Sequence, residues 1–246
     1  MKHPIPHPEP RQRMLSVQHA ICTRYTCRDF EPNPVPAEIV MEILEVANRA
    51  PSTANTQPWE IFAAAGEPLK RLRAAFVRHF EKGEAPRFEI PMESAWPPAL
   101  RKRREQTLAL HLKQFNIGPG ESSEAREHLI HNYRFFNAPA VLYLCREKGL
   151  GPWSLFDLGL FTQNVLLAAL EHGLDTAPAL MLVAYPDLIR KELEIPENLS
   201  VVFGVALGYG TPQSRPGEWR SLRRPIEEVV RLKGFESRRE FRPKEC

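Results

Sequence analysis

Apolar residues recur at helical spacing in several parts of the chain. Between Pro36 and Pro51 they form one face, which predicts an amphipathic helix with Pro36 in its first turn. Similar patterns predict helices over residues 13–24 and 68–83, the second with a strongly basic outer face. Residues 154–173 are apolar almost all round, so we expect this helix at the centre of the fold.

This central helix also carries start and stop signals. Ser154 and Asp157 are spaced like a capping pair, and Gly173 stands at the stop position. Short apolar runs rich in strand-forming residues separate the helices, at residues 59–66, 140–145 and 199–210. These patterns predict strands, and hence an α+β fold in which helices flank a sheet.

The chain shows no internal repeat and no Gly/Ser linker. We therefore predict one domain over residues 14–234, preceded by a flexible arm at 1–13 and followed by a tail at 235–246. Residues 84–125 are the hardest to interpret, because several prolines surround the basic run at 101–104. We interpret that run as the solvated face of a helix rather than a patch for polyanions.

Composition narrows the class of protein. The 246 residues are 43% hydrophobic, and 33 basic against 30 acidic residues leave a net charge of +3 without a basic block, so nothing favours nucleic-acid binding. The four cysteines form no C-x-x-C pair, which favours free thiols over a zinc site or a disulfide framework. No apolar stretch reaches the roughly 20 residues of a membrane span, and the first residues lack a secretory signal, so we expect a cytoplasmic protein.

Several familiar catalytic devices are missing from the sequence. It contains no G-x-G-x-x-G, no Walker A loop, no H-E-x-x-H and no G-x-S-x-G, and its eight histidines show no metal-ligand spacing. Nothing therefore predicts a catalytic side chain or a metal site.

Polar residues crowd both ends of the helix that follows Pro36. On its N-terminal side, Arg24 and Arg28 with Thr26 between them can present two guanidinium forks and a hydroxyl to one anion, as a phosphate site does. The same arginines could instead pair with surface carboxylates such as Glu31 or Glu38. On the C-terminal side, "PSTANTQPW" brings short amides that can donate to and accept from a heterocycle, although such a stretch can also be an ordinary turn.

The order of these motifs is similar to that of a known family. "TRYTCRDF", "PVPAEIVMEILEVANRAPSTANTQPW", "FDLGLFTQNVLLAALEHGLDTAP", "LEIPENLSVVFGVALGYG" and "RRPIEEVV" resemble successive segments of the FMN-dependent nitroreductases, from about residue 15 to 232. "NYRFFNAP" and the long insertion look most like the nitrobenzoate reductase branch. The resemblance implies a nitroreductase-like fold with a mainly antiparallel sheet, and a homodimer with FMN at its interface.

The resemblance also implies which residues bind FMN. The R-x-T-x-R segment would hold the phosphate with a later arginine, and the amide loop would meet the ring and the ribityl chain. A basic residue would lie near the pyrimidine end of the ring, and a segment after the central helix would face N5, where this chain is bulkier than its relatives. The expected cofactor-binding residues are Arg24, Tyr25, Thr26, Arg28, Pro51, Ser52, Asn55, Gln57, Arg134, Pro178, Ala179, Leu180, Met181, Gly208 and Arg223.

The implied reaction is a two-step exchange at one flavin. NAD(P)H would deliver a hydride and leave, after which a nitroaromatic compound or a quinone would be reduced on the same face. Two alternatives remain open at this point. The same fold could perform dehalogenation, oxidative ring formation or flavin fragmentation, or the chain could be a non-catalytic FMN-binding dimer.

Overall fold

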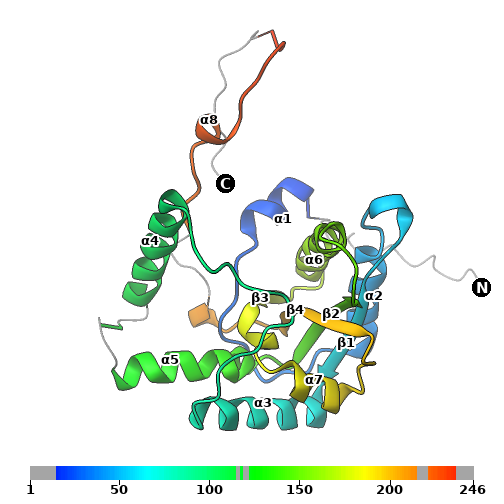
Figure 1. Cartoon of the computed structure of the whole chain (residues 1–246), viewed down its shortest axis with the longest axis vertical. Coiled ribbons are helices and arrows are strands. Elements are labelled where there is room, and N and C mark those ends of the chain that lie inside the picture. Colours follow the sequence, from blue (N-terminus) through cyan, green and yellow to red (C-terminus); the bar gives the residue numbers. More distant parts are fainter. Residues whose placement is uncertain (1–14, 115–116, 119–121, 215–220, 237–246) are drawn as a thin grey trace, which may run out of the picture.

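The computed structural model describes residues 15–114, 117–118, 122–214 and 221–236. An antiparallel sheet lies at its centre, with its strands in the order β1-β2-β4-β3 (Figure 1). The longest strand, β4, pairs with β2 on one side and β3 on the other, and a register shift falls between Leu144 and Cys145 of β2. The strands are β1 (Glu60–Ala65), β2 (Ala140–Glu147), β3 (Asp175–Ala179) and β4 (Leu199–Gly208).

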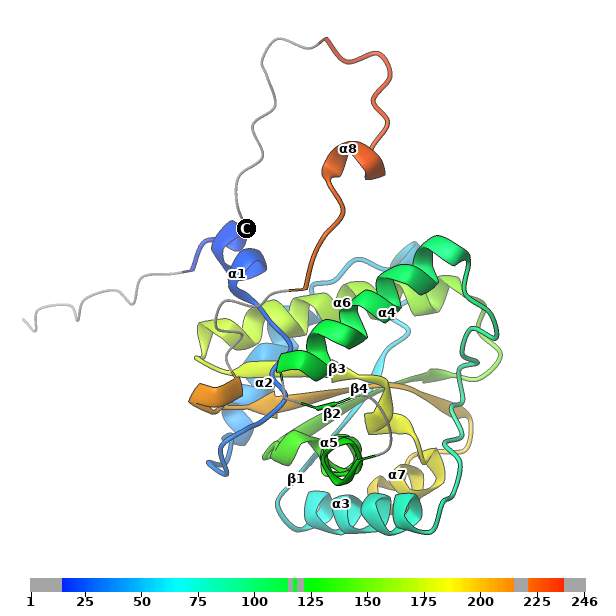
Figure 2. The same cartoon turned by 90° about the vertical axis from the view of Figure 1, so that its left-hand side faces the viewer.

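Helices cover both faces of this sheet. In Figure 2, α6 lies above it and α3 and α7 lie below, and α2 packs beside α6 on the upper face. The helices are α1 (Val17–Thr23), α2 (Ala37–Ala47), α3 (Gly66–Glu81), α4 (Pro98–Gln114), α5 (Ser123–Tyr133), α6 (Trp153–Glu171), α7 (Pro186–Leu193) and α8 (Ile226–Val229). The predicted α+β class with a mainly antiparallel sheet is confirmed.

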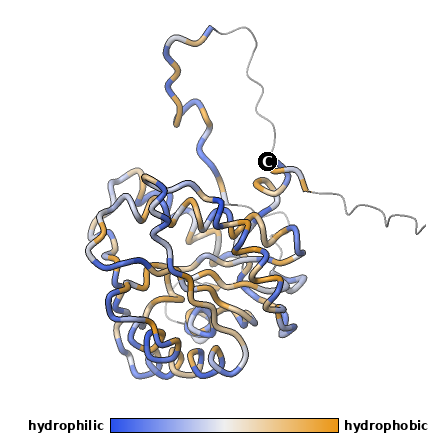
Figure 3. The backbone as a smooth tube through the Cα atoms, turned by 90° about the vertical axis from the view of Figure 1, so that its right-hand side faces the viewer, coloured by the Kyte–Doolittle hydropathy of each residue, from blue (hydrophilic) through white to orange (hydrophobic). Residues whose placement is uncertain are grey.

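Alternation along the strands explains the two layers. On β2, Leu142 and Leu144 join the core beneath α2 and α6, whereas Val141 and Tyr143 join the core beside α3 and α7. Burial on both faces removes apolar area from water on each side, which is the main stabilisation available to a sheet of this kind. Figure 3 shows the same arrangement as hydrophobic stretches concentrated in the interior of the body.

The helix expected at the centre of the fold packs against one face of the sheet, with Trp153 and Phe156 exposed on its outer side, and its start also differs from the prediction. Contrary to the expectation from the sequence, α6 is long and apolar enough to cross a membrane by length and composition alone, but its buried face packs on the sheet and α2 as in a core helix. The predicted capping pair is wrong: Pro152 is the N-cap and provides no side-chain cap. Ser154 instead accepts a hydrogen bond from Arg146, and Asp157 binds a loop far away in the sequence.

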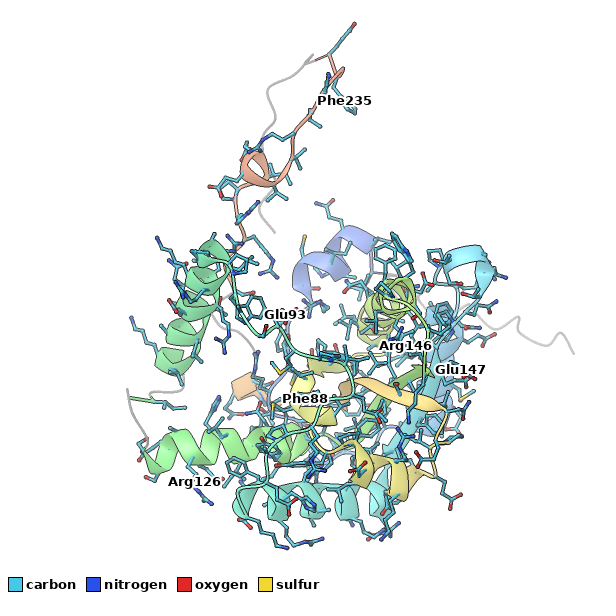
Figure 4. The ribbon with its side chains drawn as sticks, viewed as in Figure 1. Phe88, Glu93, Arg126, Arg146, Glu147 and Phe235 are labelled. Atoms are coloured by element: carbon cyan, nitrogen blue, oxygen red, sulfur yellow. The ribbon has the colours of Figure 1, made fainter. Side chains whose placement is uncertain are left out.

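The connection between α3 and α4 is fixed to the body by a partly buried ion pair. Arg190 of α7, only 9% exposed, donates to the Glu89 carboxylate at 2.8 Å, and the other Glu89 oxygen accepts the Val201 N–H of β4. Phe88 and Glu93, labelled in Figure 4, lie along this connection, which then leads to the helix predicted around residues 101–104.

Residues 221–236 project away from the body (Figures 1 and 2). Their apolar side chains are uncovered: Leu222 is 79% exposed and Phe235, at the far end in Figure 4, is 75% exposed. The proposed arm at 1–13 lies outside the described residues, and so does most of the tail.

Candidate functional site

A cavity of about 1190 Å³ lies between the segment that follows α1 and the helices α4, α5 and α6. It brings together five of the residues expected to bind a cofactor. These are Arg24, Tyr25, Thr26, Arg28 and Arg223, the last from the base of the projecting segment. The cavity therefore combines sequence positions that are nearly two hundred residues apart.

Backbone hydrogen bonds hold the first wall of this cavity. The Cys27 N–H donates to Thr176 O at 3.0 Å, where Thr26 forms a parallel bridge with β3. The Phe30 N–H donates to Phe136 O at 3.0 Å and the Glu31 N–H to Tyr209 O at 2.8 Å. The backbone that carries Arg24 and Arg28 is thus already fixed before an anion binds, which reduces the conformational entropy lost on binding.

His131 of α5 adds a side-chain contact that sequence reasoning missed. Its Nε2 lies 2.7 Å from Arg28 O, so the ring must carry its proton on Nε2 and donate it to this carbonyl. Asp29, beside it, accepts from Asn137 Nδ2 and Thr211 Oγ1, each at 3.1 Å. No local spacing pattern links these residues, so no sequence signal could have found them.

The three arginines of the cavity form no ion pair within the described part of the chain. Burial lowers the pKa of Arg24, and the nearby charge of Arg223 lowers it further. Burial also lowers the pKa of Arg28, whose guanidinium donates to Thr26 O at 3.4 Å.

A cluster of cations without carboxylate partners is disfavoured unless an anion joins it. The alternative of arginines paired with Glu31 or Glu38 is therefore not what the structure shows. Glu31 instead accepts from Asn33 at 3.1 Å. The arrangement has the chemistry of a phosphate or carboxylate site.

The amide loop does not line this cavity. Residues 51–57 lie against the first turns of α6, where the Thr53 N–H donates to both oxygens of Asp157 at 3.2 Å. Gln163 of α6 does line the cavity, and six residues of helix correspond to about 9 Å along its axis. Within one chain, Pro51, Ser52, Asn55 and Gln57 are thus separated from the arginines.

The remaining expected residues also lie outside the cavity. Pro178 and Ala179 end β3, and Leu180 and Met181 begin the 3-10 turn that follows it. Arg134 forms an ion pair with Glu127 and lines a different surface groove, beside Arg73 of α3.

At Gly208, the last residue of β4, packing alone requires a residue without a side chain. A Cβ at this position would lie 2.5 Å from Pro139 Cδ, a separation that real side chains do not reach. Close packing therefore requires a glycine here whether or not a cofactor binds.

Two of the cysteines, Cys27 and Cys145, do not line the cavity, whereas Cys22 does. Cys27 and Cys145 are buried free cysteines, and burial raises the pKa of Cys27 to about 11, which keeps it protonated at neutral pH. Cys22, in contrast, is disulfide-bonded, so the expectation of free thiols is wrong for this residue.

Comparison with known proteins identifies the fold family. The model of the Nitroreductase family matches residues 21–209. The chain belongs to the nitroreductase family. Within it, the chain is 31% identical over 225 residues to a chloronitrobenzene nitroreductase of Comamonas testosteroni, covering 87% of this chain and 95% of that protein. It is 29% identical over 217 residues to a 4-nitrobenzoate reductase of Pseudomonas putida, covering 88% of this chain and 95% of that protein.

A solved nitroreductase has nearly the same fold. The FMN-dependent nitroreductase NfnB from Mycobacterium smegmatis, determined in complex with NADPH, superposes with a TM-score of 0.83 at 26% identity. The superposition covers 88% of this chain and 97% of the other. The family match over residues 21–209 spans all four strands of the central sheet, and the fold predicted from the motifs is confirmed.

Proposed function

We propose that the chain is an FMN-dependent NAD(P)H oxidoreductase that reduces nitroaromatic compounds and, at the same flavin, quinones. The observation that carries this proposal is the group of Arg24, Arg28 and Arg223 around one cavity. None of the three forms an ion pair with a described residue, although Asp29, Glu124 and Glu127 also line the cavity. The FMN-dependent and NADPH-bound relative supports the choice of cofactor and reductant. The two relatives named for nitroaromatic substrates support the choice of acceptor.

The residues of the cavity fit the terminal phosphate of FMN. Three guanidinium groups more than balance the double negative charge of a phosphate, and the Thr26 hydroxyl adds a further donor. Each charge-assisted hydrogen bond is worth roughly 1.5–3 kcal/mol, so these groups together would hold the phosphate firmly. His131 contributes indirectly to phosphate binding, because its hydrogen bond to the Arg28 carbonyl holds the backbone that carries the Arg28 guanidinium.

Bound FMN supplies the redox chemistry, and the protein supplies binding, orientation and electrostatics. Arg24, Arg28 and Arg223 would bind and orient the phosphate end. Asn55 and Gln57 would meet the edge of the ring, and the segment Pro178–Met181 would limit the space above it. Arg134 would favour an anionic reduced ring.

A homodimer would explain why the arginines and the amide loop are apart in one chain. The cofactor would lie between the cavity of one chain and residues 51–57 of the other. Uncovered apolar side chains support such an assembly: Trp153 and Phe156 on α6 are 70% and 60% exposed, and the projecting segment adds Leu232 at 71%. Location in the cytoplasm stays a prediction from the sequence.

The decisive experiment uses the full-length protein reconstituted with FMN. Oxidation of NADH and of NADPH is followed under anaerobic conditions with nitrobenzoate, with a quinone and without an acceptor. We expect the yellow flavin band to bleach with the reductant and to return when nitrobenzoate is added. Protein that takes up no FMN would contradict the proposal, and FMN that stays oxidised with both reductants would instead indicate a non-catalytic binding module.

A further inference from the structure

The loop Ser52–Gln57 has an unusual backbone. Ala54, Asn55 and Gln57 all have positive φ, at 50°, 58° and 47°. Residues with a Cβ rarely adopt this left-handed conformation, and it persists only where surrounding contacts impose it. Some group must therefore hold the loop in this shape.

Contacts within the loop account for only part of it. The Gln57 N–H donates to Ser52 Oγ at 2.9 Å, and Gln57 Nε2 donates to Asn55 O at 3.0 Å. These bonds close the turn upon itself but do not fix it to the body of the protein. They do not determine how the whole loop is oriented relative to α6 and the sheet.

Asp157 of α6 provides the missing attachment. Both of its oxygens accept the Thr53 N–H at 3.2 Å, and its Oδ1 lies 3.4 Å from Thr53 Oγ1. Within the described part of the chain, no other side chain from outside the loop hydrogen-bonds to residues 52–57. One carboxylate on the central helix thus fixes the loop.

Burial of the Asp157 carboxylate costs free energy unless hydrogen bonds such as those from Thr53 compensate it. Asp157 is 2% exposed, and its carboxylate forms no ion pair with the described residues. A buried carboxylate without a cation is strongly disfavoured relative to an apolar side chain of similar size, so simple packing of α6 does not explain it. The Thr53 N–H and hydroxyl are what compensate the charge.

We propose that Asp157 is a positioning residue that imposes the strained shape of the loop and so decides how Asn55 and Gln57 meet the flavin ring. This inference rests on the proposed function, since it assigns the loop to FMN. Asp157 itself touches no reacting atom. It acts through the Thr53 backbone.

The test compares two variants of the full-length protein. Asp157→Asn keeps the shape of the side chain but removes the charge and one acceptor oxygen. Ser154→Ala is the matched control, because Ser154 is also buried on α6, one turn earlier, and contacts Arg146 (labelled in Figure 4) and Gly151 rather than the loop. Both variants change one buried polar side chain of the same helix.

Two measurements separate positioning from general damage. Hydrogen exchange over residues 50–59 is measured on the apo protein, and the Kd and visible circular dichroism of bound FMN are measured after reconstitution. We expect Asp157→Asn to exchange the Thr53 amide at least tenfold faster, to raise the Kd of FMN at least tenfold and to change the flavin spectrum. Ser154→Ala should leave all three unchanged.

Wild-type exchange and affinity in folded Asp157→Asn would overturn the proposal, and so would equal changes in both variants. Faster exchange without any change in the FMN spectrum or Kd would also overturn it, because the loop would then be shaped by Asp157 but not used for the ring. Wild-type protein that binds no FMN would refute the proposed function, while the exchange data would still decide whether Asp157 shapes the loop.

Discussion

Replacing Arg24 with alanine tests the anion site directly. Arg24 shares the cavity with Arg28 and Arg223, and its guanidinium forms no hydrogen bond or ion pair with the residues that the structure describes. Its guanidinium would contribute at least one charge-assisted hydrogen bond to the phosphate, worth roughly 1.5–3 kcal/mol. Because each 1.4 kcal/mol changes a dissociation constant about tenfold, Arg24→Ala should raise the Kd of FMN roughly 10- to 150-fold.

The same substitution should not weaken the fold. Burial and the neighbouring charge of Arg223 both lower the pKa of Arg24, which means that the folded protein disfavours its charged form. Removing this side chain relieves that repulsion. The free energy of unfolding of the apo protein should therefore stay unchanged or rise slightly.

The assay combines FMN titration, followed by quenching of flavin fluorescence, with urea unfolding of the apo protein. Arg71→Ala is the matched control, because it removes the same charge from α3, where Arg71 pairs with Glu192 at the surface. Such exposed pairs contribute little, so this control should bind FMN normally. An Arg24→Ala protein with wild-type FMN affinity, or one that loses affinity only as much as it loses stability, would refute the assignment of the cavity.

Three further predictions concern the same region and its support. Thr26→Val should weaken FMN binding about tenfold because a donor hydroxyl is lost, and Thr26→Ser should restore it, as measured by the same titration. Gly204→Ala would place a Cβ 2.5 Å from Leu182 Cβ, and overpacking of this kind costs about 1–3 kcal/mol. The midpoint of thermal unfolding should therefore fall by several degrees. Gly151→Ala, which has open space around its Cβ, should leave the midpoint unchanged. Burial raises the pKa of Cys27 to about 11 from an ordinary 9.0, so the folded protein favours the protonated thiol. The free energy of unfolding contributed by this thiol should be fully present below pH 9 and should fall between pH 9 and 11. Urea unfolding of Cys27→Ala should show a shallower fall over the same pH range.

Much of the fold could be predicted from the sequence because its signals are local. The apolar face between Pro36 and Pro51 gave α2, and the run at 199–210 gave β4, since both depend only on residue spacing. The cluster of Arg24, Thr26 and Arg28 could be predicted for the same reason. Arg223 was reached only through the resemblance to the family.

Long-range contacts were beyond the reach of that reasoning. Ser154 and Asp157 have the spacing of a capping pair, but their partners are Arg146 and Thr53, and Thr53 lies 104 residues away. The tertiary partners outweigh the local cap. Likewise, the resemblance to the family implies that the arginines and the amide loop bind one cofactor, whereas the fold of a single chain separates them along α6.

The segment that carries Arg24 and Arg28 also covers an edge of the sheet. β3 is the last strand on its side, and an open strand edge is a template for pairing with other chains and for aggregation. The parallel bridge between Thr26 and Thr176 occupies part of that edge. Substitutions that loosen this segment should therefore lower solubility as well as cofactor content, so a loss of yellow colour in such a variant has to be measured on the fraction that stays monodisperse.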